Sequence, residues 1–297
     1  MEHAIRSQDL TRSFGKITVV HGLNLQVRPG AITAFLGPNG AGKTTTISLL
    51  LGLIKATSGS CEVLGLPPGH PLALAQIGAL VESPSLYDHL TGMENLEITR
   101  LMRDHPKVEL DRVLKLVNLT GDANRPVREY SLGMRQRLGM ALALMGQPSL
   151  LILDEPTNGL DPAGIQDMRE LIRGLPKETG ASVFLSSHLL AEVEQVAGDL
   201  VVIHKGRLRY QGPMEQLGAA DQADLILRVG NTALAQSILE TEGYRCREVE
   251  DRIWVRAQAA EAPRVAACLV GGGCDLYELT PRKANLEARF LALLEEA

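Results

Sequence analysis

The chain has 297 residues, of which 45% are hydrophobic and 22% charged, and its formal net charge is −5. This length allows one large domain and a small one. The mild acidity argues against a non-specific nucleic-acid binder, which usually presents a basic face. We expect neither a targeting segment at the N-terminus nor a membrane span, since no apolar stretch approaches the roughly 20 residues that a bilayer requires. Four scattered cysteines without a CxxC pair favour reduced thiols in a cytosolic protein.

The first 215 or so residues alternate between predicted strands and helices. Residues 1–30 predict short strands, and residues 92–147 are mostly helical in pattern. The other predicted strands are AITAFLG, SCEVLG, IGALVE, SLLILDEP, ASVFLSSH and DLVVIHKG, and the other predicted helices are KTTTISLLLGLI, Ala163–Leu175 and Leu189–Val196. Buried strands that alternate with helices predict an α/β fold with a parallel sheet covered on both faces.

A change in composition near LGAADQ predicts a linker over residues 217–222, between a domain of residues 1–216 and a second one of residues 223–297. The second domain has the pattern β-α-β-α-β-α, and its middle strand region, REVEDRIWVRAQ, is long enough for a hairpin. This pattern predicts a small α+β domain of the ferredoxin-like type.

Residues 37–44 read GPNGAGKT, which fits the pattern G-x-x-x-x-G-K-[ST] between an apolar strand and a helix. Glycines at 37, 40 and 42 let successive N–H groups point inward at phosphate oxygens, and the start of the helix adds positive charge. Lys43 can bridge two phosphates and the Thr44 hydroxyl can bind Mg²⁺. The sequence therefore predicts a nucleotide phosphate site.

An acidic pair, Asp154 and Glu155, ends the apolar strand LLILDEP. Open α/β sheets bind ligands at the carboxyl ends of their strands. Beside a phosphate site, we expect Asp154 to hold Mg²⁺ and Glu155 to polarise the attacking water, because phosphoryl transfer needs both roles.

GPNGAGKT, SLGMR before a helix, LLILDEP, Gly159-Leu160-Asp161 and Ser187-His188 follow one another in this order. From residue 1 to about 215 the chain resembles the nucleotide-binding subunits of ABC transporters, and it is similar within them to ATPases of type-2 (ABC-2) exporters, including bacitracin- and lantibiotic-resistance transporters. The resemblance implies a P-loop NTPase core, an N-terminal antiparallel β subdomain and a helical subdomain at about residues 84–147.

The resemblance also implies roles for individual residues. Ser131 and Gly133 match the family's LSGGQ signature, whereas Tyr130, Leu132 and Met134 depart from it; an ordinary capped helix start is the alternative. The signature would contact an ATP held by a second copy, so that two chains meet head-to-tail around two ATPs. The expected ATP contacts are Phe14, Gly37, Pro38, Asn39, Gly40, Ala41, Gly42, Lys43, Thr44, Thr45, Ser131, Gly133 and Asp161, and the expected catalytic residues are Asp154, Glu155 and His188. For Phe14, adenine stacking and core packing both stay open.

Glu82 stands where the family has glutamine. As a carboxylate it could bind Mg²⁺ together with Thr44 and Asp154, because hard cations favour charged oxygen ligands. The segment that follows is apolar for a loop, and we expect it to pack on a cytoplasmic helix of a transmembrane partner; the alternative is that it fills the protein's own core. Its apolar residues are Leu86, Tyr87, Leu90 and Met93.

The motifs and the resemblance together imply the ATPase motor of an ABC transporter, with ATP and Mg²⁺ as ligands, and the resemblance alone favours export. The expected partners are a second copy and an integral membrane permease, with no nucleic acid, and the expected location is the cytoplasmic face of the cell membrane. A soluble ABC-type ATPase and a P-loop kinase are the competing functions. Translation ATPases of this kind carry two ATPase domains and repair ATPases carry coiled-coil insertions, and neither feature is expected from this sequence. A kinase would give no reason for the signature residues.

Overall fold

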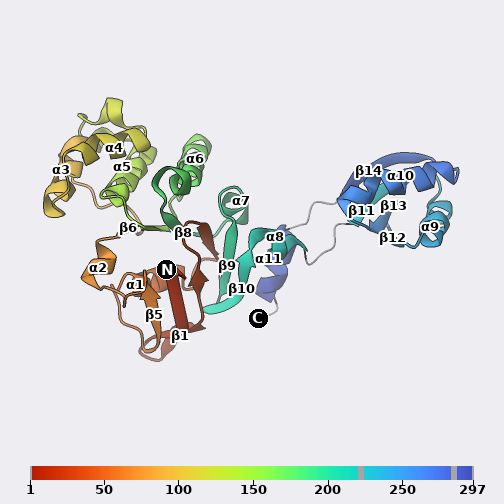
Figure 1. Ribbon diagram of the computed structural model, residues 1–297, viewed down its shortest axis with the longest axis horizontal. Helices are drawn as coiled ribbons and strands as arrows, with labels where there is room; N and C mark the ends of the chain where they lie inside the picture. The colour runs from red at the N-terminus through yellow and green to blue at the C-terminus, as the bar shows by residue number, and fades with distance from the viewer. Residues whose placement is uncertain (1, 220–223, 282–285, 296–297) are drawn as a thin grey trace. The chain divides into compact units, whose positions relative to one another are not determined.

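A computed structural model describes residues 2–219, 224–281 and 286–295 (Figure 1). It divides into two compact units, Met1–Met214 and Glu215–Glu295. Each unit has its own hydrophobic core. None of the helices in the described part of the chain has the length and apolar character needed to span a membrane.

The first unit contains a six-stranded sheet with the strand order β10-β9-β4-β8-β7-β6. Five strands run parallel, and β10 pairs antiparallel with β9 at the edge. Every residue of β4, β7 and β8 is buried, which confirms the predicted parallel sheet with both faces covered. The strands are β4 (Ile32–Leu36), β6 (Ile77–Leu80), β7 (Leu150–Asp154), β8 (Ser182–Ser187), β9 (Asp199–His204) and β10 (Arg207–Pro213).

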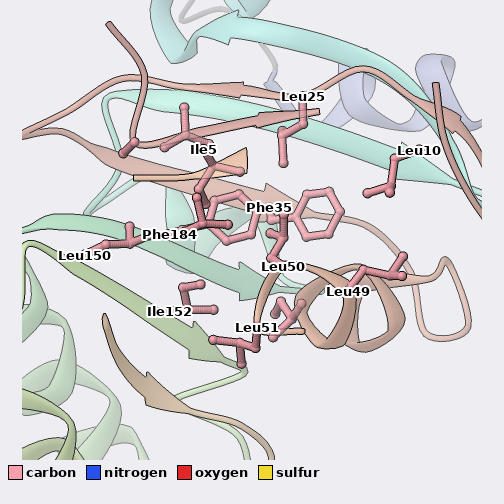
Figure 2. Packing of buried hydrophobic residues seen from close by; sticks show 14 of the residues in the cluster. Ile5, Leu10, Leu25, Phe35, Leu49, Leu50, Leu51, Leu150, Ile152 and Phe184 are labelled. Carbon is pink, nitrogen blue, oxygen red and sulfur yellow. The ribbon is translucent and has the colours of Figure 1, made fainter. Parts of the chain in front are cut away.

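An antiparallel sheet and helix α1 (Lys43–Leu50) pack on the central sheet. Figure 2 shows Leu49 and Leu50 at the end of α1 among side chains of both sheets, including Ile5 and Phe184. In this core the ring centroids of Phe35 and Phe184 lie 5.2 Å apart. The antiparallel strands are β1 (Ile5–Phe14), β2 (Ile17–Leu23), β3 (Gln26–Val27) and β5 (Ser58–Val63). This apolar packing fixes α1 at the carboxyl edge of β4.

Helices α3, α4 and α5 form the predicted helical subdomain, and α5 packs closely on the edge strand β6. A Cβ on Gly78 of β6 would lie 1.9 Å from the Ala143 carbonyl oxygen, and a Cβ on Gly139 would lie 2.8 Å from the Pro84 ring. Helix α5 and β6 can therefore meet only because both positions are glycine. Besides α1, this unit contains the helices α2 (Pro71–Leu74), α3 (Gly92–Met102), α4 (Val108–Leu116), α5 (Leu132–Leu144), α6 (Pro162–Thr179) and α7 (Leu190–Val193), with 3₁₀ turns η1 (Thr120–Asp122) and η2 (Val127–Glu129).

The second unit has the antiparallel strand order β12-β13-β11-β14. This order and its βαββαβ connectivity confirm the ferredoxin-like prediction. The elements are β11 (Asp224–Val229), α9 (Thr232–Thr241), β12 (Arg245–Val249), β13 (Arg252–Arg256), η3 (Ala259–Glu261), α10 (Ala262–Gly271), β14 (Leu276–Pro281) and α11 (Leu286–Glu295). Helices α9 and α10 pack on the sheet through buried residues such as Leu239 and Leu269. All four cysteines of the chain have free thiols.

The predicted linker of residues 217–222 overlaps the end of a helix. Residues 217–219 complete helix α8 (Met214–Ala219), and residues 220–222 lie outside the described residues. Met214 and Leu217, three positions apart on one helix face, are both buried. Burial of this apolar pair outweighs the glycine and alanine composition that suggested a linker.

Candidate functional site

The loop from Gly37 to Gly42 joins β4 to α1 and forms a concave backbone surface. A Cβ at position 37 would lie 2.3 Å from the Ile203 carbonyl oxygen, so only glycine fits. Gly42 is the N-cap of α1, has a φ of 101° and gives no side-chain cap to the helix. The first N–H groups of α1 thus face the loop, as an anion site at a helix N-terminus requires.

The ammonium of Lys43 lies at the floor of this loop, and the side chain is only 6% exposed. Its Nζ donates to the Gly37 carbonyl oxygen at 2.8 Å and lies 3.1 Å from Glu155 Oε1. A buried ammonium must be paired or hydrogen-bonded. The loop carbonyls and Glu155 fulfil that need and hold the positive charge where an anionic group would enter.

A cavity of about 340 Å³ opens over the loop and brings several sequence-predicted residues together. Its lining consists of Val19, Asn39, Gly40, Gly42, Lys43, Thr44, Thr45, Glu155, Asn158 and His188. Pro38 lies beneath the cavity, with its carbonyl oxygen 3.4 Å from Lys43 Nζ. Ala41 is buried, and its carbonyl oxygen accepts from the Gly206 N–H. Backbone donors, one cation and one carboxylate therefore face the same space.

Thr44 lines the cavity, and Asp154, which is not among the lining residues, places its carboxylate oxygens next to the Thr44 hydroxyl. Thr44 Oγ1 donates to Asp154 Oδ2 at 2.9 Å, and the Ser186 hydroxyl donates to Asp154 Oδ1. Asp154 is 2% exposed. A hydroxyl next to a fixed carboxylate matches the oxygen donors that Mg²⁺ prefers. The donor set of Thr44 and Asp154 therefore fits the expected metal.

Glu155 is held in a sparsely populated backbone conformation, with a φ of 48°. Its N–H donates to Ser186 Oγ at 3.0 Å, and its Oε2 lies 2.7 Å from His188 Nδ1. Left-handed backbone at a non-glycine residue costs about 1 kcal/mol or more and is enriched at functional sites. The strain aims the carboxylate at the cavity and at His188.

The signature residues lie on a surface that does not line this cavity. Ser131 caps α5 by accepting from the Met134 N–H at 3.3 Å. A Cβ at Gly133 would have no neighbour closer than 3.9 Å, so none of the described residues requires glycine there. The glycine therefore leaves room for an atom from outside the chain.

Asp161 lies on the same surface. Its Oδ1 caps α6 by accepting from the Gly164 N–H at 2.9 Å, and the residue is exposed. A Cβ added at Gly159, two residues before it, would lie 3.2 Å from Leu132. The Gly159–Asp161 turn and the signature are thus neighbours, and we call residues 131–133 with 159–161 the signature surface.

Phe14 ends β1 with 47% of its surface exposed, and the Arg12 guanidinium lies 4.3 Å from its ring centroid. This exposure rules out the core-packing alternative. The ring is outside the residues that line the cavity, so adenine stacking stays a prediction.

Glu82 follows β6 with a φ of 55° and is exposed. It is not among the residues that line the cavity, and in the described part of the chain it has no hydrogen bond or ion pair. The structure therefore does not bring Glu82 into contact with Thr44 or Asp154, and a metal-binding role stays a prediction.

The apolar loop after Glu82 is anchored from beneath rather than buried. Tyr87 exchanges backbone hydrogen bonds with the buried Asn95 side chain, at 2.8 and 3.1 Å, while 53% of the tyrosine is exposed. Leu86, Leu90 and Met93 are partly buried. Asp88 pairs with Arg135 of α5, which ties the loop to the signature helix. The partly buried leucines and methionine therefore account for part of the loop's apolar character, whereas the Tyr87 side chain is exposed to solvent.

An apolar cavity of about 440 Å³ lies next to this loop. Leu80, Pro84 and Leu142 are among its lining residues. So are Leu53 and Leu74, which are 66% and 38% exposed. The helical subdomain and the sheet edge therefore present an open apolar cleft.

Three contributors to the site escaped the sequence analysis. Val19 and Asn158 line the first cavity, and Ser186 binds both Asp154 and the Glu155 N–H. Two serines at the end of the apolar strand VFLSS were an available signal for Ser186, because a buried hydroxyl needs a partner. Val19 carries no such signal, since it reads as an ordinary strand residue.

Comparisons with known proteins agree with this site. The sequence model of a family described as "ABC transporter" matches residues 20–158. The bacitracin transport ATP-binding protein BcrA of Bacillus licheniformis is 39% identical over 301 residues, covering 99% of this chain and 98% of that protein. The lantibiotic transport ATP-binding protein SrtF of Streptococcus pyogenes is 42% identical over 207 residues, covering 69% of this chain and 88% of that protein. Among solved structures, cbiO1 from Clostridium perfringens, described as part of the ABC transporter complex cbiONQ, has a TM-score of 0.68 and 25% identity, covering 74% of this chain and 92% of that one.

Proposed function

Because the chain belongs to the ABC transporter family as an ATP-binding, ATP-hydrolysing subunit, we propose that two copies meet head-to-tail around two ATPs. Each ATP would bind the loop Gly37–Thr44 of one copy and the signature surface of the other. The observation that carries this proposal is the place of Ser131 and Gly133. They form a capped, open helix start, yet they do not line the cavity of their own chain. A twofold axis gives both sites the same composition.

Within each site, Glu155 is the general base that takes a proton from the attacking water. His188, 2.7 Å from the Glu155 carboxylate, orients that carboxylate and contacts the terminal phosphate. Lys43 and the α1 N–H groups bind phosphate oxygens, and Phe14 stacks on adenine. Thr44 and Asp154 would hold Mg²⁺, which when bound supplies positive charge that offsets the phosphate charge.

We further propose that the motor drives an integral membrane permease from the cytoplasmic face of the membrane. A cytoplasmic helix of the permease would occupy the apolar cleft beside Tyr87, and the Asp88–Arg135 pair would pass its movement to the signature helix. Export is the favoured direction, because the chain resembles the ATPases of type-2 exporters and its relatives include proteins named for transport of bacitracin and of lantibiotics. No nucleic acid is involved in this function.

A Glu155→Gln variant tests the proposal, since it preserves the shape of the site while removing the base. It should bind ATP, hydrolyse it at least about a hundredfold more slowly and accumulate as a dimer. Size-exclusion chromatography with light scattering in ATP, against ADP, measures the dimer, and phosphate release measures turnover. Near-normal turnover would remove the role of Glu155. A variant that stayed monomeric at saturating ATP would contradict the head-to-tail pair.

A further inference from the structure

The last two residues of β8 are serines whose hydroxyls bind on different sides of the strand. Ser186 Oγ donates to Asp154 and accepts from the Glu155 N–H, so it supports the strand end next to it. Ser187 Oγ instead lies 3.3 Å from Glu192 Oε2, and its carbonyl oxygen accepts from the Gly37 N–H. His188 follows directly, so its backbone position depends on both serines.

Glu192 is a buried carboxylate of α7, with 7% of its surface exposed. Its Oε2 accepts from the Thr157 hydroxyl at 2.7 Å as well as from Ser187, and its Oε1 lies 4.0 Å from Arg169 Nη2. Thr157 lies two residues after Glu155 and four before Asp161. A single carboxylate oxygen therefore joins the segment that carries Glu155 and Asp161 to the strand that carries His188.

Burial of a carboxylate is costly, and replacing a buried polar cluster with apolar residues of similar shape is often neutral or stabilising. Stability alone therefore gives little reason for this cluster. The strained segment that it holds gives a better one, because Glu155 has a left-handed backbone that the surroundings must maintain. Thr157 is 8% exposed, so water does not supply the same support.

We propose that Glu192 is a positioning residue, which sets the relative place of Glu155 and His188 through its bonds to Thr157 and Ser187. The inference rests on the proposed roles of Glu155 and His188. It extends them because Glu192 is outside the residues that line the cavity and, within the described part of the chain, its hydrogen bonds and ion pair are with Thr157, Ser187 and Arg169 rather than with the phosphate loop or the signature surface. Any shift of the Asp161 segment would reach His188 through this carboxylate.

The test compares Thr157→Val, Glu192→Ala, Glu192→Gln and the double variant Thr157→Val/Glu192→Ala in the full-length chain. Thr157→Val and Glu192→Ala should lower kcat about tenfold, as expected from misplacement of a catalytic group, with KM for ATP changed less than about twofold. Glu192→Gln should recover most of kcat, because its amide oxygen can accept from both hydroxyls. The double variant should be no slower than Glu192→Ala, since both changes remove one shared interaction.

Glu109→Ala is the matched control, because Glu109 is also a buried carboxylate with an arginine partner but lies on α4. It should lower Tm and leave kcat unchanged. Normal kcat in Thr157→Val, or a Glu192→Gln as slow as Glu192→Ala, would overturn the positioning role. Glu155→Gln keeps the two proposals apart. If it turns over normally, the base assignment fails; if it is inactive while Thr157→Val is normal, only the Glu192 proposal fails.

Discussion

The imidazole of His188 lies within hydrogen-bonding distance of the Glu155 carboxylate, with 2.7 Å between Nδ1 and Oε2. The two residues directly follow neighbouring parallel strands, since β7 ends at Asp154, β8 ends at Ser187, and the strands pair in register up to Asp154 and Ser186. The other oxygen of Glu155 lies 3.1 Å from Lys43. The carboxylate is therefore fixed from both sides, and the removal of either partner frees it to rotate.

His188→Ala should lower kcat about a hundredfold while ATP affinity falls less than about tenfold, because the base remains but loses its orientation. Steady-state phosphate release and equilibrium binding of a fluorescent ATP analogue separate the two effects. His70→Ala, at the start of α2 and outside the cavity lining, is the control and should keep full turnover. Equal turnover of His188→Ala and the wild type would contradict the pairing.

Ser131→Arg should permit ATP binding but abolish ATP-dependent dimer formation, since a long cation at the start of α5 fills the space that Gly133 leaves open. The effect is measured in the Glu155→Gln background by light scattering. Ser237→Arg, on the exposed side of α9 in the second unit, introduces the same side chain elsewhere and should still dimerise. A dimer of unchanged stability in the Ser131→Arg chain would show that the signature surface is not the contact.

Leu53→Glu should weaken association with the permease while basal ATP hydrolysis persists, because Leu53 lines the apolar cleft and is 66% exposed. The measurement is co-purification of the tagged chain with an integral membrane protein from detergent-solubilised membranes of the native cell. Val270→Glu is the matched control, with 62% exposure on α10. Equal co-purification of the Leu53→Glu and Val270→Glu variants with the permease would contradict the proposal that the permease binds this cleft.

Glu109→Gln should lower the free energy of unfolding by about 2 kcal/mol at pH 7, the range for hydrogen bonds to a charged group. The Arg112 side chain, with help from the Gly146 N–H, lowers the pKa of Glu109 from 4.5 to about 2. A carboxyl with a depressed pKa stabilises the fold above its unfolded pKa and loses that effect as the pH falls toward its folded pKa. The difference between wild type and variant in urea unfolding should therefore shrink below pH 4.5 and vanish near pH 2. A difference independent of pH would contradict the ion pair.

Hydrophobic pattern and motif spacing were sufficient for the fold and for most of the residues that line the phosphate cavity, with Val19 and Asn158 missed. The apolar run AITAFLG identified β4, and the order of strands and helices identified both units, because burial leaves a periodic trace in sequence. Patterns could not show that Phe14 would be exposed, since an isolated aromatic residue fits a core or a surface equally well. The composition of residues 217–219 gave no sign of helix α8, because one buried apolar pair is too short a signal.

Contacts between distant residues were beyond the reach of the sequence. Glu192 and Thr157 are 35 positions apart, and each reads as an ordinary helix or loop residue by itself. The left-handed backbone of Glu155 was equally hidden, because glutamate gives no sign of a positive φ. The same holds for Glu82, whose distance from Asp154 depends on how the loop leaves β6.

The contact between α5 and β6 has a mechanical consequence. At Gly78 and Gly139 the helix meets the sheet edge and Pro84 with no room for a single methyl group. Packing this tight resists sliding of the helix along the sheet edge. We therefore expect the helix to respond to a load by tilting about these two glycines. Ser131 caps the N-terminal end of α5, whereas Ala143 lies near its C-terminal end. A small displacement of the segment around Pro84 would therefore produce a larger displacement of the N-terminal end of the helix. We therefore expect substitution of Gly78 or Gly139 by alanine to impair movement of α5 more than it impairs nucleotide binding.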